Sequence, residues 1–345
     1  MEQMRIFITG GAGFIGCNLA AHYLKQGHVV TLFDNLSRPR TELNLRWLQE
    51  QAGAAQLCFV RGDIRDYPFL LEAVTQAQPE LIVHLAAQVA VTTSVKNPRE
   101  DFEINALGTF NVLEAARAQP NPPAVFYAST NKVYGGMEDV ATVLDGTRYR
   151  YRDLPYGVSE VQPLDLHSPY GCSKGAGDQY VRDYARIYGL RTVVFRQSCI
   201  YGERQFGVED QGWVAHFIIA AAFNRPITIY GDGKQVRDLL HVQDLIAAYE
   251  AAWARLDQVS GQVFNLGGGA ENALSIWAEF GPMLEMLAGR PIPVRYADWR
   301  PGDQPVFISD NRKAERLLDW RPRISAQEGI RRLWAWVTSN PELFH

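Results

Sequence analysis

The stretch ITGGAGFIG, residues 8–16, follows a short apolar run and leads into a segment with helical spacing. Its glycines permit a tight turn and let backbone N–H groups approach a pyrophosphate at the start of a helix. Such a loop is informative only between a strand and a helix, which is the context found here. It therefore predicts a dinucleotide site. The loop residues expected at the cofactor are Gly10, Gly13, Phe14, Ile15 and Gly16.

Short β-branched runs alternate with amphipathic segments on both sides of this loop. Near-continuous apolar runs of this length suit a parallel sheet that is covered on both faces. Strand and helix in alternation predict an α/β fold with a doubly wound parallel sheet of the Rossmann type. The predicted strands are residues 5–10, 28–34, 57–63, 81–87, 124–130 and 191–196, and residues 103–118 have helical spacing.

The pattern changes after residue 196, where loops lengthen and Trp, Pro and Arg become frequent. This change predicts a smaller C-terminal α/β domain that supplies substrate contacts. Residues 241–256, followed by VFNLG, look like a return to the first domain. We therefore expect a Rossmann domain of 1–195 plus 236–266 and a substrate domain of 196–235 plus 267–345.

Composition limits the classes of partner. The 345 residues carry a net charge of −4, which disfavours nucleic acid as a partner. The N-terminus lacks a signal-peptide layout, and the apolar stretch 217–223 is far shorter than the ~20 residues that span a membrane. The four cysteines show no metal-ligand spacing and are typical of reduced cytosolic thiols. We expect a cytoplasmic protein without a metal site.

Asp34 ends the second predicted strand, 18 residues after Gly16. A carboxylate there can hold the ribose hydroxyls and would repel a 2′-phosphate, so NAD is favoured over NADP. Arg38 and Arg40 lie nearby and leave two interpretations open, a 2′-phosphate contact or a solvated loop. Asp63 is placed to meet the adenine. The cofactor site is completed by the neighbouring residues Asn35, Ile64, Ala86 and Gln88.

Residues 167–190 read as one helix, with Ser168 as N-cap, Pro169 in the first turn and Gly189 at the end. Tyr170 and Lys174 are then four residues apart on one face. An ammonium close to a phenol favours the phenolate, so we expect the pKa of Tyr170 to be lowered toward neutrality. Such a tyrosine can take a proton from a sugar hydroxyl while hydride leaves the same carbon for NAD.

A hydroxyl from another strand, Thr130, is expected to bind the reacting oxygen, and completes a predicted catalytic set with Tyr170 and Lys174. The alternative for the Tyr–Lys pair alone is an ordinary surface i,i+4 contact. The glycine loop, Asp34 and STNKVYG, in this order along the chain, favour the catalytic interpretation.

Taken together, TGGAGFIG, Asp34, HLAAQ, STNKVYG, SPYGCSK and VRDLLHVQD resemble the extended short-chain dehydrogenase/reductase family, in its nucleotide-sugar epimerase and dehydratase branch. The resemblance covers nearly the whole chain. Longer stretches, such as 88–105 and 164–190, are similar to the subgroup of 2-epimerases that act on CDP-linked 3,6-dideoxyhexoses. The resemblance implies a tightly held NAD that oxidises C2 and returns the hydride to the opposite face. It also implies a homo-oligomer such as a tetramer, and a role in O-antigen and lipopolysaccharide biosynthesis.

Within this resemblance the catalytic hydroxyl falls on Thr130 rather than Ser129, and the next residues are Asn131 and Lys132. Dehydratases of the family carry an Asp-Glu pair there, which drives elimination. Without a second acid/base the site should oxidise and reduce but not eliminate, and epimerisation needs nothing more. Lys132 can face the substrate or be a loop cation, and the sequence leaves both open.

The resemblance also implies the substrate contacts. Arg237 and Arg300 lie in glycine-containing loops and are the pyrophosphate candidates, because a guanidinium fork suits phosphate oxygens. His84 lies on an apolar strand and is expected to be a core histidine. The predicted substrate-binding residues are Gln88, Asn131, Arg204, Gln205, Lys234, Arg237 and Arg300, with Trp213 as a weaker candidate.

Three alternatives stay open at this level. One is another epimerase of the same branch, acting at C4 or on a UDP or GDP sugar. Another is a regulator that binds NAD and catalyses nothing, although such proteins usually lose the Tyr–Lys pair. The third is a net dehydrogenase, because the sequence does not show whether the cofactor is retained.

Overall fold

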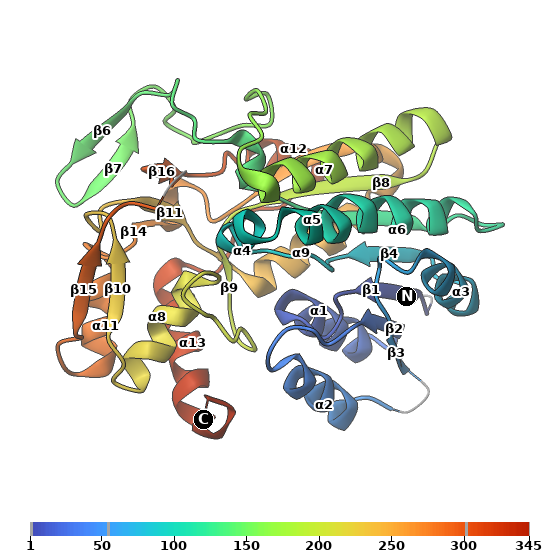
Figure 1. Ribbon diagram of the computed structural model, residues 1–345, viewed down its shortest axis with the longest axis horizontal. Coiled ribbons are helices and arrows are strands. Elements are labelled where there is room, and N and C mark those ends of the chain that lie inside the picture. Colours follow the sequence, from blue (N-terminus) through green and yellow to red (C-terminus); the bar gives the residue numbers. More distant parts are fainter. Residues whose placement is uncertain (1–2, 54–55, 301–302, 345) are drawn as a thin grey trace. The chain divides into compact units, whose positions relative to one another are not determined.

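The structure is a computed structural model that describes residues 3–53, 56–300 and 303–344. The chain folds into two compact units (Figure 1). Unit 1 comprises Met1–Thr130, Ser168–Arg196 and Ala252–Val263, and unit 2 comprises Asn131–His167, Gln197–Ala251 and Phe264–His345. Each unit is described by itself below.

Unit 1 contains most of a seven-stranded sheet with the order β13-β8-β5-β4-β1-β2-β3, of which Gln197 in β8 and Phe264–Leu266 in β13 are assigned to unit 2. The pairs β1–β2, β2–β3, β1–β4 and β4–β5 are all parallel. The sequence order reverses at β1, and in such sheets ligands bind beyond the carboxyl ends of the strands at this reversal. The strands are β1 (Arg5–Thr9), β2 (Val29–Asp34), β3 (Leu57–Arg61), β4 (Leu81–His84), β5 (Ala124–Thr130), β8 (Thr192–Gln197) and β13 (Gln262–Leu266). The predicted doubly wound fold is confirmed.

Helices accompany this sheet along the chain. They are α1 (Phe14–Lys25), α2 (Thr41–Gln51), α3 (Tyr67–Ala77), α4 (Val91–Lys96), α5 (Pro98–Phe102), α6 (Gly108–Arg117), α7 (Ser168–Tyr188) and α10 (Leu256–Val259). A π-helical turn, Glu103–Leu107, joins α5 to α6. The helix expected over 103–118 therefore begins with a π turn, which apolar spacing over so few residues cannot reveal.

The core of unit 1 lies between the sheet and these helices. Phe7, Ile82 and Val125 from the strands pack with Val112 and Leu113 of α6 and are fully or almost fully buried. These residues come from the near-continuous apolar runs of the sequence. Burial on both faces of a parallel sheet explains why those runs do not alternate with polar residues.

Helix α7 has the ends that its sequence predicts. The Ser168 hydroxyl accepts a hydrogen bond from the Gly171 N–H at 3.2 Å, which satisfies one of the unpaired donors of the first turn. Gly189 follows the helix with φ +67°, a conformation that glycine adopts without steric cost. The helix thus presents Tyr170 and Lys174 one turn apart near its N-terminus.

Unit 2 combines small sheets with helices. β11 (Val236–Asp238) lies between β14 (Ala273–Ser275) and β16 (Val306–Phe307), and β10 (Ile227–Tyr230) pairs with β15 (Val294–Ala297). β9 (Ile200–Tyr201) pairs with β12 (Leu240–His241), and β6 (Thr142–Asp145) forms a hairpin with β7 (Arg148–Tyr151). Its helices are α8 (Trp213–Ala222), α11 (Phe280–Ala288), α12 (Arg312–Leu318) and α13 (Ala326–Ser339), together with most of α9 (Val242–Ala254). An apolar core that includes Ile218, Phe280 and Leu333 holds them together.

The two units differ from the predicted domain limits mainly in two long segments, 131–167 and 236–251, which belong to unit 2. Residues 264–266 also belong to unit 2, and Arg196 belongs to unit 1. The reason lies in the pairing of the two long segments. β11 pairs with β14 and β16, and the Tyr151 hydroxyl of β7 donates to the Val306 carbonyl at 2.8 Å. Local pattern places such segments next to the sheet that precedes them, whereas their partners come from much later in the chain.

None of the helices in the part of the chain that the structure describes is both long and apolar enough to cross a bilayer.

Candidate active site

The glycine loop has the close packing that its sequence predicts. Gly10 has φ +67°, and a Cβ at this position would lie 2.7 Å from the Ala86 nitrogen. A Cβ on Gly16 would collide with the Gly10 carbonyl oxygen. The Gly13 N–H donates to that same carbonyl at 3.0 Å, so the loop turns tightly into α1. No larger residue fits, and the α1 N-terminus is left open to an anion.

Asp34, at the end of β2, is held beside this loop. Its carboxylate accepts hydrogen bonds from the Ala12 N–H at 3.0 Å and the Leu36 N–H at 2.8 Å. Burial raises the pKa of Asp34, while these two N–H groups and the charge of Arg38 oppose that rise. The carboxylate therefore stands where the second strand meets the loop, as predicted. Arg38 is exposed, as expected of a solvated loop residue, and its charge also acts on Asp34.

Asp63 follows β3 and is the centre of a second polar group. It accepts a hydrogen bond from the Asn35 side chain at 2.9 Å and from both Nε and Nη2 of Arg65, at 3.0 and 2.7 Å. The Arg65 hydrogen bond is the main reason why the pKa of Asp63 falls to about 2. Asp63 is thus a fixed anion next to Asn35, which the sequence had placed in the same cofactor site.

Thr130 and Tyr170 meet within unit 1. The Thr130 side chain hydrogen-bonds the Tyr170 phenol, and both residues are 8% exposed. Burial is nevertheless the dominant influence and raises the pKa of Tyr170 to about 12. Among the smaller influences, the charge of Asp101 also raises this pKa, whereas the Thr130 hydrogen bond and the charge of Arg38 lower it. Thr130 and Tyr170, two members of the predicted catalytic set, are therefore in contact. The predicted lowering of this pKa toward neutrality is wrong for the protein without ligands.

Lys174 explains that difference. Its Nζ donates to the Ala128 carbonyl at 2.6 Å and lies 4.2 Å from the centre of the Tyr127 ring, with no hydrogen bond to Tyr170. Burial lowers the pKa of Lys174 to about 7, against the influence of Asp178 and Asp101. The ammonium is thus itself poorly stabilised, and it is directed at the backbone of β5 rather than at the phenol.

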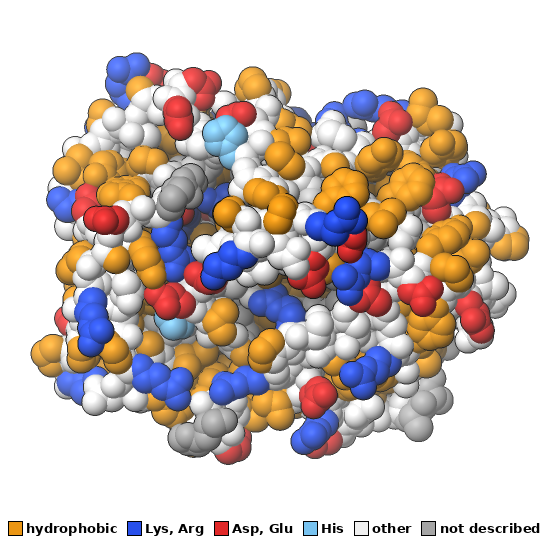
Figure 2. All heavy atoms as spheres, viewed as in Figure 1, with side chains coloured by type: hydrophobic (Ala, Val, Ile, Leu, Met, Phe, Trp, Pro, Cys, Tyr) orange, Lys and Arg blue, Asp and Glu red, His pale blue; other side chains and the backbone are white. Residues whose placement is uncertain are grey.

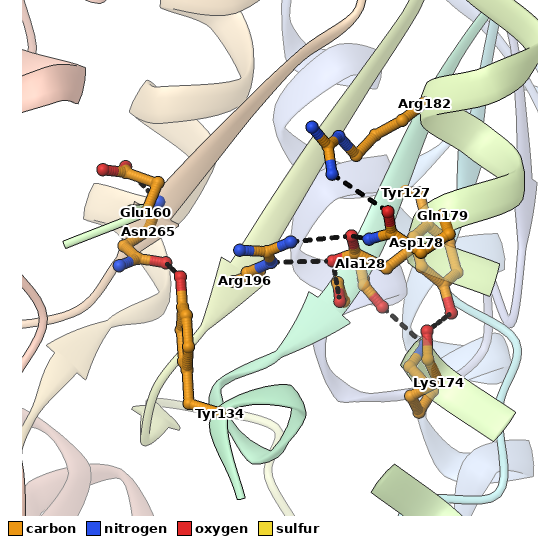
Figure 3. A network of polar contacts seen from close by, with 11 residues as sticks. Tyr127, Ala128, Tyr134, Glu160, Lys174, Asp178, Gln179, Arg182, Arg196 and Asn265 are labelled. Carbon is orange, nitrogen blue, oxygen red and sulfur yellow. Dashed lines mark hydrogen bonds and ion pairs between the residues drawn. The ribbon is translucent and has the colours of Figure 1, made fainter. Parts of the chain in front are cut away.

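Behind Lys174 lies a buried ion pair that the sequence interpretation missed (Figure 3). Asp178 accepts from Arg196 at 2.8 and 2.9 Å and from the Ser129 hydroxyl at 2.8 Å. The Tyr127 hydroxyl donates to the Lys174 carbonyl at 3.2 Å. The network ties β5, β8 and α7 together around Lys174. The available signal was the spacing, because Asp178 is four residues after Lys174 on the same helix.

His84 proves to be a core histidine, as expected. Its Nδ1 lies 2.7 Å from the Thr9 hydroxyl and its Nε2 lies 3.0 Å from the Thr109 hydroxyl. Burial, followed by the charge of Lys174, lowers the pKa of His84 to about 3, so the ring is neutral. Thr109 in turn donates to the Asn105 carbonyl at 2.6 Å, which extends the polar chain to the π turn.

Gln88 is held by the protein itself. Its Nε2 donates to the Ala90 carbonyl at 2.9 Å and to Asp101 at 2.8 Å, and its Oε1 accepts from the Ala90 N–H at 2.6 Å. The side-chain amide is therefore occupied within unit 1. Its backbone N–H donates to the Asn105 side chain at 3.0 Å, and its carbonyl accepts from the same amide at 2.9 Å. A role for Gln88 at the cofactor or substrate stays a prediction.

In unit 2, Lys132 and Arg237 share one carboxylate. Lys132 Nζ and Arg237 Nη2 lie 3.9 and 3.8 Å from the same oxygen of Asp303. Burial and the nearby charge of Arg237 lower the pKa of Lys132, which Asp303 opposes. Lys132 and Asn131 both lie in the 3-10 turn Asn131–Tyr134 that begins the unit. Lys132 is thus close to a predicted pyrophosphate residue, and is not an isolated loop cation.

The other predicted substrate residues of unit 2 are spread over several loops. Arg300 lies 3.8 Å from the centre of the Tyr230 ring and 3.3 Å from Asp210. Gln205 is buried and donates to the Ile200 carbonyl at 3.2 Å, and Arg204 lies 5.8 Å from the centre of the Trp336 ring. Lys234 is in the turn where its N–H donates to Asp232 at 3.0 Å. None of the described residues forms a His, Cys, Asp and Glu cluster that could hold a metal ion.

Comparison with known proteins decides the family. The model of the NAD dependent epimerase/dehydratase family matches residues 6–267. This chain belongs to that family. It is 46% identical over 341 residues to the CDP-paratose 2-epimerase of Salmonella typhi, covering 97% of this chain and all of the relative. The expected resemblance is therefore confirmed, and NAD dependence, expected from the glycine loop and Asp34, is a property of the family.

Solved members of this epimerase/dehydratase family share the whole fold. The UDP-glucose 4-epimerase from Stenotrophomonas maltophila, with NAD and formylated UDP-arabinopyranose, matches with a TM-score of 0.84 and 26% identity over 99% of both chains. The Thermus thermophilus UDP-glucose 4-epimerase complex with NAD matches with a TM-score of 0.79 and 31% identity, covering 96% of this chain and 98% of that one. Homologues in the family thus use nucleotide sugars.

Proposed function

We propose that this chain is an NAD-dependent epimerase that inverts C2 of a CDP-linked 3,6-dideoxyhexose, converting CDP-paratose to CDP-tyvelose. The observation that carries the proposal is the 46% identity to a CDP-paratose 2-epimerase along the full length of that relative. Identity that extends through the substrate unit, and not only through the dinucleotide loop, supports the same sugar nucleotide as substrate.

The residues of unit 1 fit NAD. The glycine loop leaves no room for a Cβ at Gly10 or Gly16, which keeps the backbone N–H groups at the α1 N-terminus accessible to a pyrophosphate. The Asp34 carboxylate at the end of β2 suits ribose hydroxyls and repels a 2′-phosphate. Bound NAD would supply the hydride acceptor for a sugar carbinol carbon and the hydride for its reduction.

The proton of that carbinol is the part of the reaction assigned to this chain's own residues. Thr130 holds the sugar oxygen and hydrogen-bonds Tyr170, and the Tyr170 phenolate accepts the hydroxyl proton. Because burial holds the pKa of Tyr170 at about 12, positive charge must reach it from Lys174 or arrive with the ligands before it can act near neutral pH. The same phenol returns the proton when the ketone is reduced from its other face.

The next two residues limit what else can happen. Asn131 and Lys132 lie in the turn that follows Thr130, and neither is a carboxylic acid. Expulsion of a neighbouring hydroxyl needs an acid to protonate it and a base to take the adjacent proton. The proposed product is therefore an isomer of the substrate.

Unit 2 supplies cations for the diphosphate. Arg237 and Arg300 are the proposed contacts, since a guanidinium can give two parallel hydrogen bonds to phosphate oxygens. Lys132 adds a second positive charge beside Arg237, with Asp303 as the shared counter-ion. Asn131, Arg204, Gln205 and Lys234 are proposed to contact the rest of the substrate.

A homo-oligomer is part of the proposal. Exposed apolar side chains gather over α6 and α7 (Figure 2), and include Phe110, Tyr180, Ile187 and Tyr188, which are 37–66% exposed. A second copy of the chain is the proposed occupant of this face, in a cytoplasmic enzyme of O-antigen biosynthesis. Light scattering after gel filtration tests this, because the variant Ile187→Lys should give a smaller species.

Product analysis tests the activity. The purified protein is incubated with CDP-paratose, UDP-glucose and dTDP-glucose, and the sugar ring is examined by NMR. Inversion at C2 of the CDP sugar alone is expected. The second candidate, a 4-epimerase, is favoured by the fold shared with UDP-glucose 4-epimerases. Turnover of UDP-glucose at C4, with CDP-paratose unchanged, would establish it instead.

A further inference from the structure

Asp101 is a buried carboxylate beside the predicted catalytic helix. It lies on α5, is 0% exposed, and accepts hydrogen bonds from three side chains. Oδ1 accepts from Gln88 at 2.8 Å and from Asn105 at 3.1 Å, and Oδ2 accepts from the Ser173 hydroxyl at 2.5 Å. All three donors are neutral. Among the described residues, no cation forms an ion pair with this carboxylate, so its negative charge is not locally cancelled.

Asp178, the other carboxylate near Lys174, is in a different situation. Asp178 accepts hydrogen bonds from two nitrogens of the Arg196 guanidinium, and both side chains are buried. Asp178 raises the pKa of Lys174 more than Asp101 does, but its charge is shared with Arg196, and the field of an ion pair falls off faster than that of a single charge. Asp101 is therefore the carboxylate whose charge acts on Lys174 without a cationic partner of its own.

The hydrogen bonds of Asp101 reach the turn of α7 that carries the proposed base. Ser173 is adjacent to Lys174, and its hydroxyl also lies 3.2 Å from the Tyr170 carbonyl. On the other side, Gln88 belongs to the loop after β4, and its amide is fixed to Ala90. One carboxylate thus links the loop after β4, the π turn and the start of α7.

We propose that Asp101 is a positioning residue, which clamps the loop after β4 to the first turns of α7 and supplies the uncompensated negative charge that keeps Lys174 an ammonium. This inference rests on the proposed function in taking Tyr170 and Lys174 as the reacting pair. A buried carboxylate with only neutral partners is costly to maintain, and the charge of Lys174 is what offsets that cost.

Several charged or titratable groups act on this pair and must be considered together. Burial dominates for Lys174, and Asp178 and Asp101 both raise its pKa. For Tyr170, Asp101 raises the pKa while Arg38 lowers it. The groups that face the pair are Asp178 on α7, Asp101 on α5, His84 on β4, Tyr127 on β5 and Arg38 after β2. Removing the charge of Asp101 should therefore move both titrations to lower pH.

Two variants separate the clamp from the charge. Asp101→Asn keeps the shape and removes the charge, whereas Ser173→Ala removes one hydrogen bond and leaves the charge. The control is Asp244→Asn, which changes another buried carboxylate, in unit 2, that accepts the Ile324 N–H at 2.9 Å. Should Asp101→Asn fail to fold, Asp101→Ser removes the same charge and leaves room for water.

The decisive measurement does not need turnover. The chain has six lysines, so the protein without ligands can be labelled with [ε-13C]lysine and titrated by NMR, with Lys174 assigned from a Lys174→Met variant. We expect the Lys174 midpoint to fall by roughly one pH unit in Asp101→Asn. It should stay in place in Ser173→Ala and Asp244→Asn. An unchanged midpoint in the folded Asp101 variant would overturn the proposal, whether or not the protein turns over any sugar.

The kinetic arm then tests the link to catalysis. The pH profile of kcat should shift to lower pH in Asp101→Asn, by the same amount as the Lys174 midpoint, while Ser173→Ala should raise KM or lower kcat without moving the profile. A shift of one pH unit corresponds to about a tenfold change in rate on a sloping limb. An unmoved kcat profile together with a shifted Lys174 midpoint would show that Lys174 does not limit the reaction, and would refute the catalytic part alone.

Discussion

Asp178 accepts two hydrogen bonds from the Arg196 guanidinium, at 2.8 and 2.9 Å, and both side chains are buried. Asp178 follows Lys174 by one turn of α7, and Arg196 is near the end of β8. The Ser129 hydroxyl of β5 donates to the same carboxylate at 2.8 Å. The strand that carries Thr130 is therefore fixed to the helix that carries Tyr170 through an ion pair behind both residues.

Breaking this ion pair should destabilise the protein. Asp178→Asn leaves the Arg196 charge buried without its partner, and the loss of one member of a buried pair typically costs about 3–5 kcal/mol. Urea unfolding should show this loss in the free energy of unfolding. Asp183→Asn on the exposed side of the same helix is the control, and should stay within about 0.5 kcal/mol of the wild type. A similar small effect for Asp178→Asn would contradict the structural role given to the pair.

Tyr170→Phe should abolish most of the activity and leave NAD binding intact. The ring that fills the site is kept, and only the hydroxyl that hydrogen-bonds Thr130 is lost. Removing a general acid–base typically costs about 10²–10⁴-fold in rate. Tyr180→Phe, an exposed tyrosine of the same helix, is the control and should keep wild-type turnover. Near wild-type turnover in Tyr170→Phe would end the assignment of the base.

NAD should bind much more tightly than NADP. The Asp34 carboxylate is fixed by the Ala12 and Leu36 N–H groups and cannot easily turn away from a 2′-phosphate. Calorimetry with both cofactors measures the preference, and Asp34→Ala should reduce it. If NADP binds more tightly than NAD, then Arg38, which acts on Asp34 in this structure, outweighs the carboxylate.

Turnover in D₂O should invert C2 of a CDP-3,6-dideoxyhexose and leave that carbon protiated. Thr130 and Tyr170 handle only the hydroxyl proton, and the hydrogen on carbon travels as hydride, which does not exchange with water. Mass spectrometry of the product should show no loss of water, since Asn131 and Lys132 supply no acid. Deuterium at C2 would indicate a deprotonation mechanism. A loss of about 18 mass units, the mass of one water molecule, would indicate elimination by an acid other than those assigned here.

His84 should make the protein sensitive to acid. The pKa of His84 is about 3 in the folded protein, against an ordinary value of 6.5. Between pH 3 and pH 6.5, the unfolded chain therefore binds a proton at His84 that the folded chain does not bind. The contribution of neutral His84 to the free energy of unfolding is therefore fully present above pH 6.5. It falls as the pH drops below this value, by up to about 1.4 kcal/mol for each pH unit. His84→Gln should flatten this part of the curve of unfolding free energy against pH. Equal slopes in the wild type and in His84→Gln would refute the role of His84.

The sequence alone predicted the fold and the order of its parts. Apolar runs and helical spacing depend on neighbouring residues, so the strands of unit 1 and the ends of α7 follow from local pattern. The glycine loop and Asp34 were also readable, because a tight turn restricts which residue types can stand there. The family resemblance came from long strings of sequence, such as the one around Tyr170 and Lys174, and did not need coordinates.

Tertiary structure decided the electrostatics. The i,i+4 spacing of Tyr170 and Lys174 predicts an ammonium that activates a phenol, but burial raises the pKa of the tyrosine and lowers that of the lysine. Spacing along a helix says which side chains share a face. It does not say how much water is excluded from them, and desolvation is here the largest influence on both groups.

Tertiary structure also decided the partners of the polar side chains. Gln88 was predicted to meet a ligand, yet its amide is bonded to Ala90 and Asp101. Lys132 could not be assigned from the sequence, and Asp303, its counter-ion beside Arg237, comes from 171 residues later in the chain. Asp101 reaches Ser173 across 72 residues. Contacts at such separations depend on how the whole chain packs, which no local pattern records, whereas the strands and helices that bring these residues together are set by their neighbours in sequence.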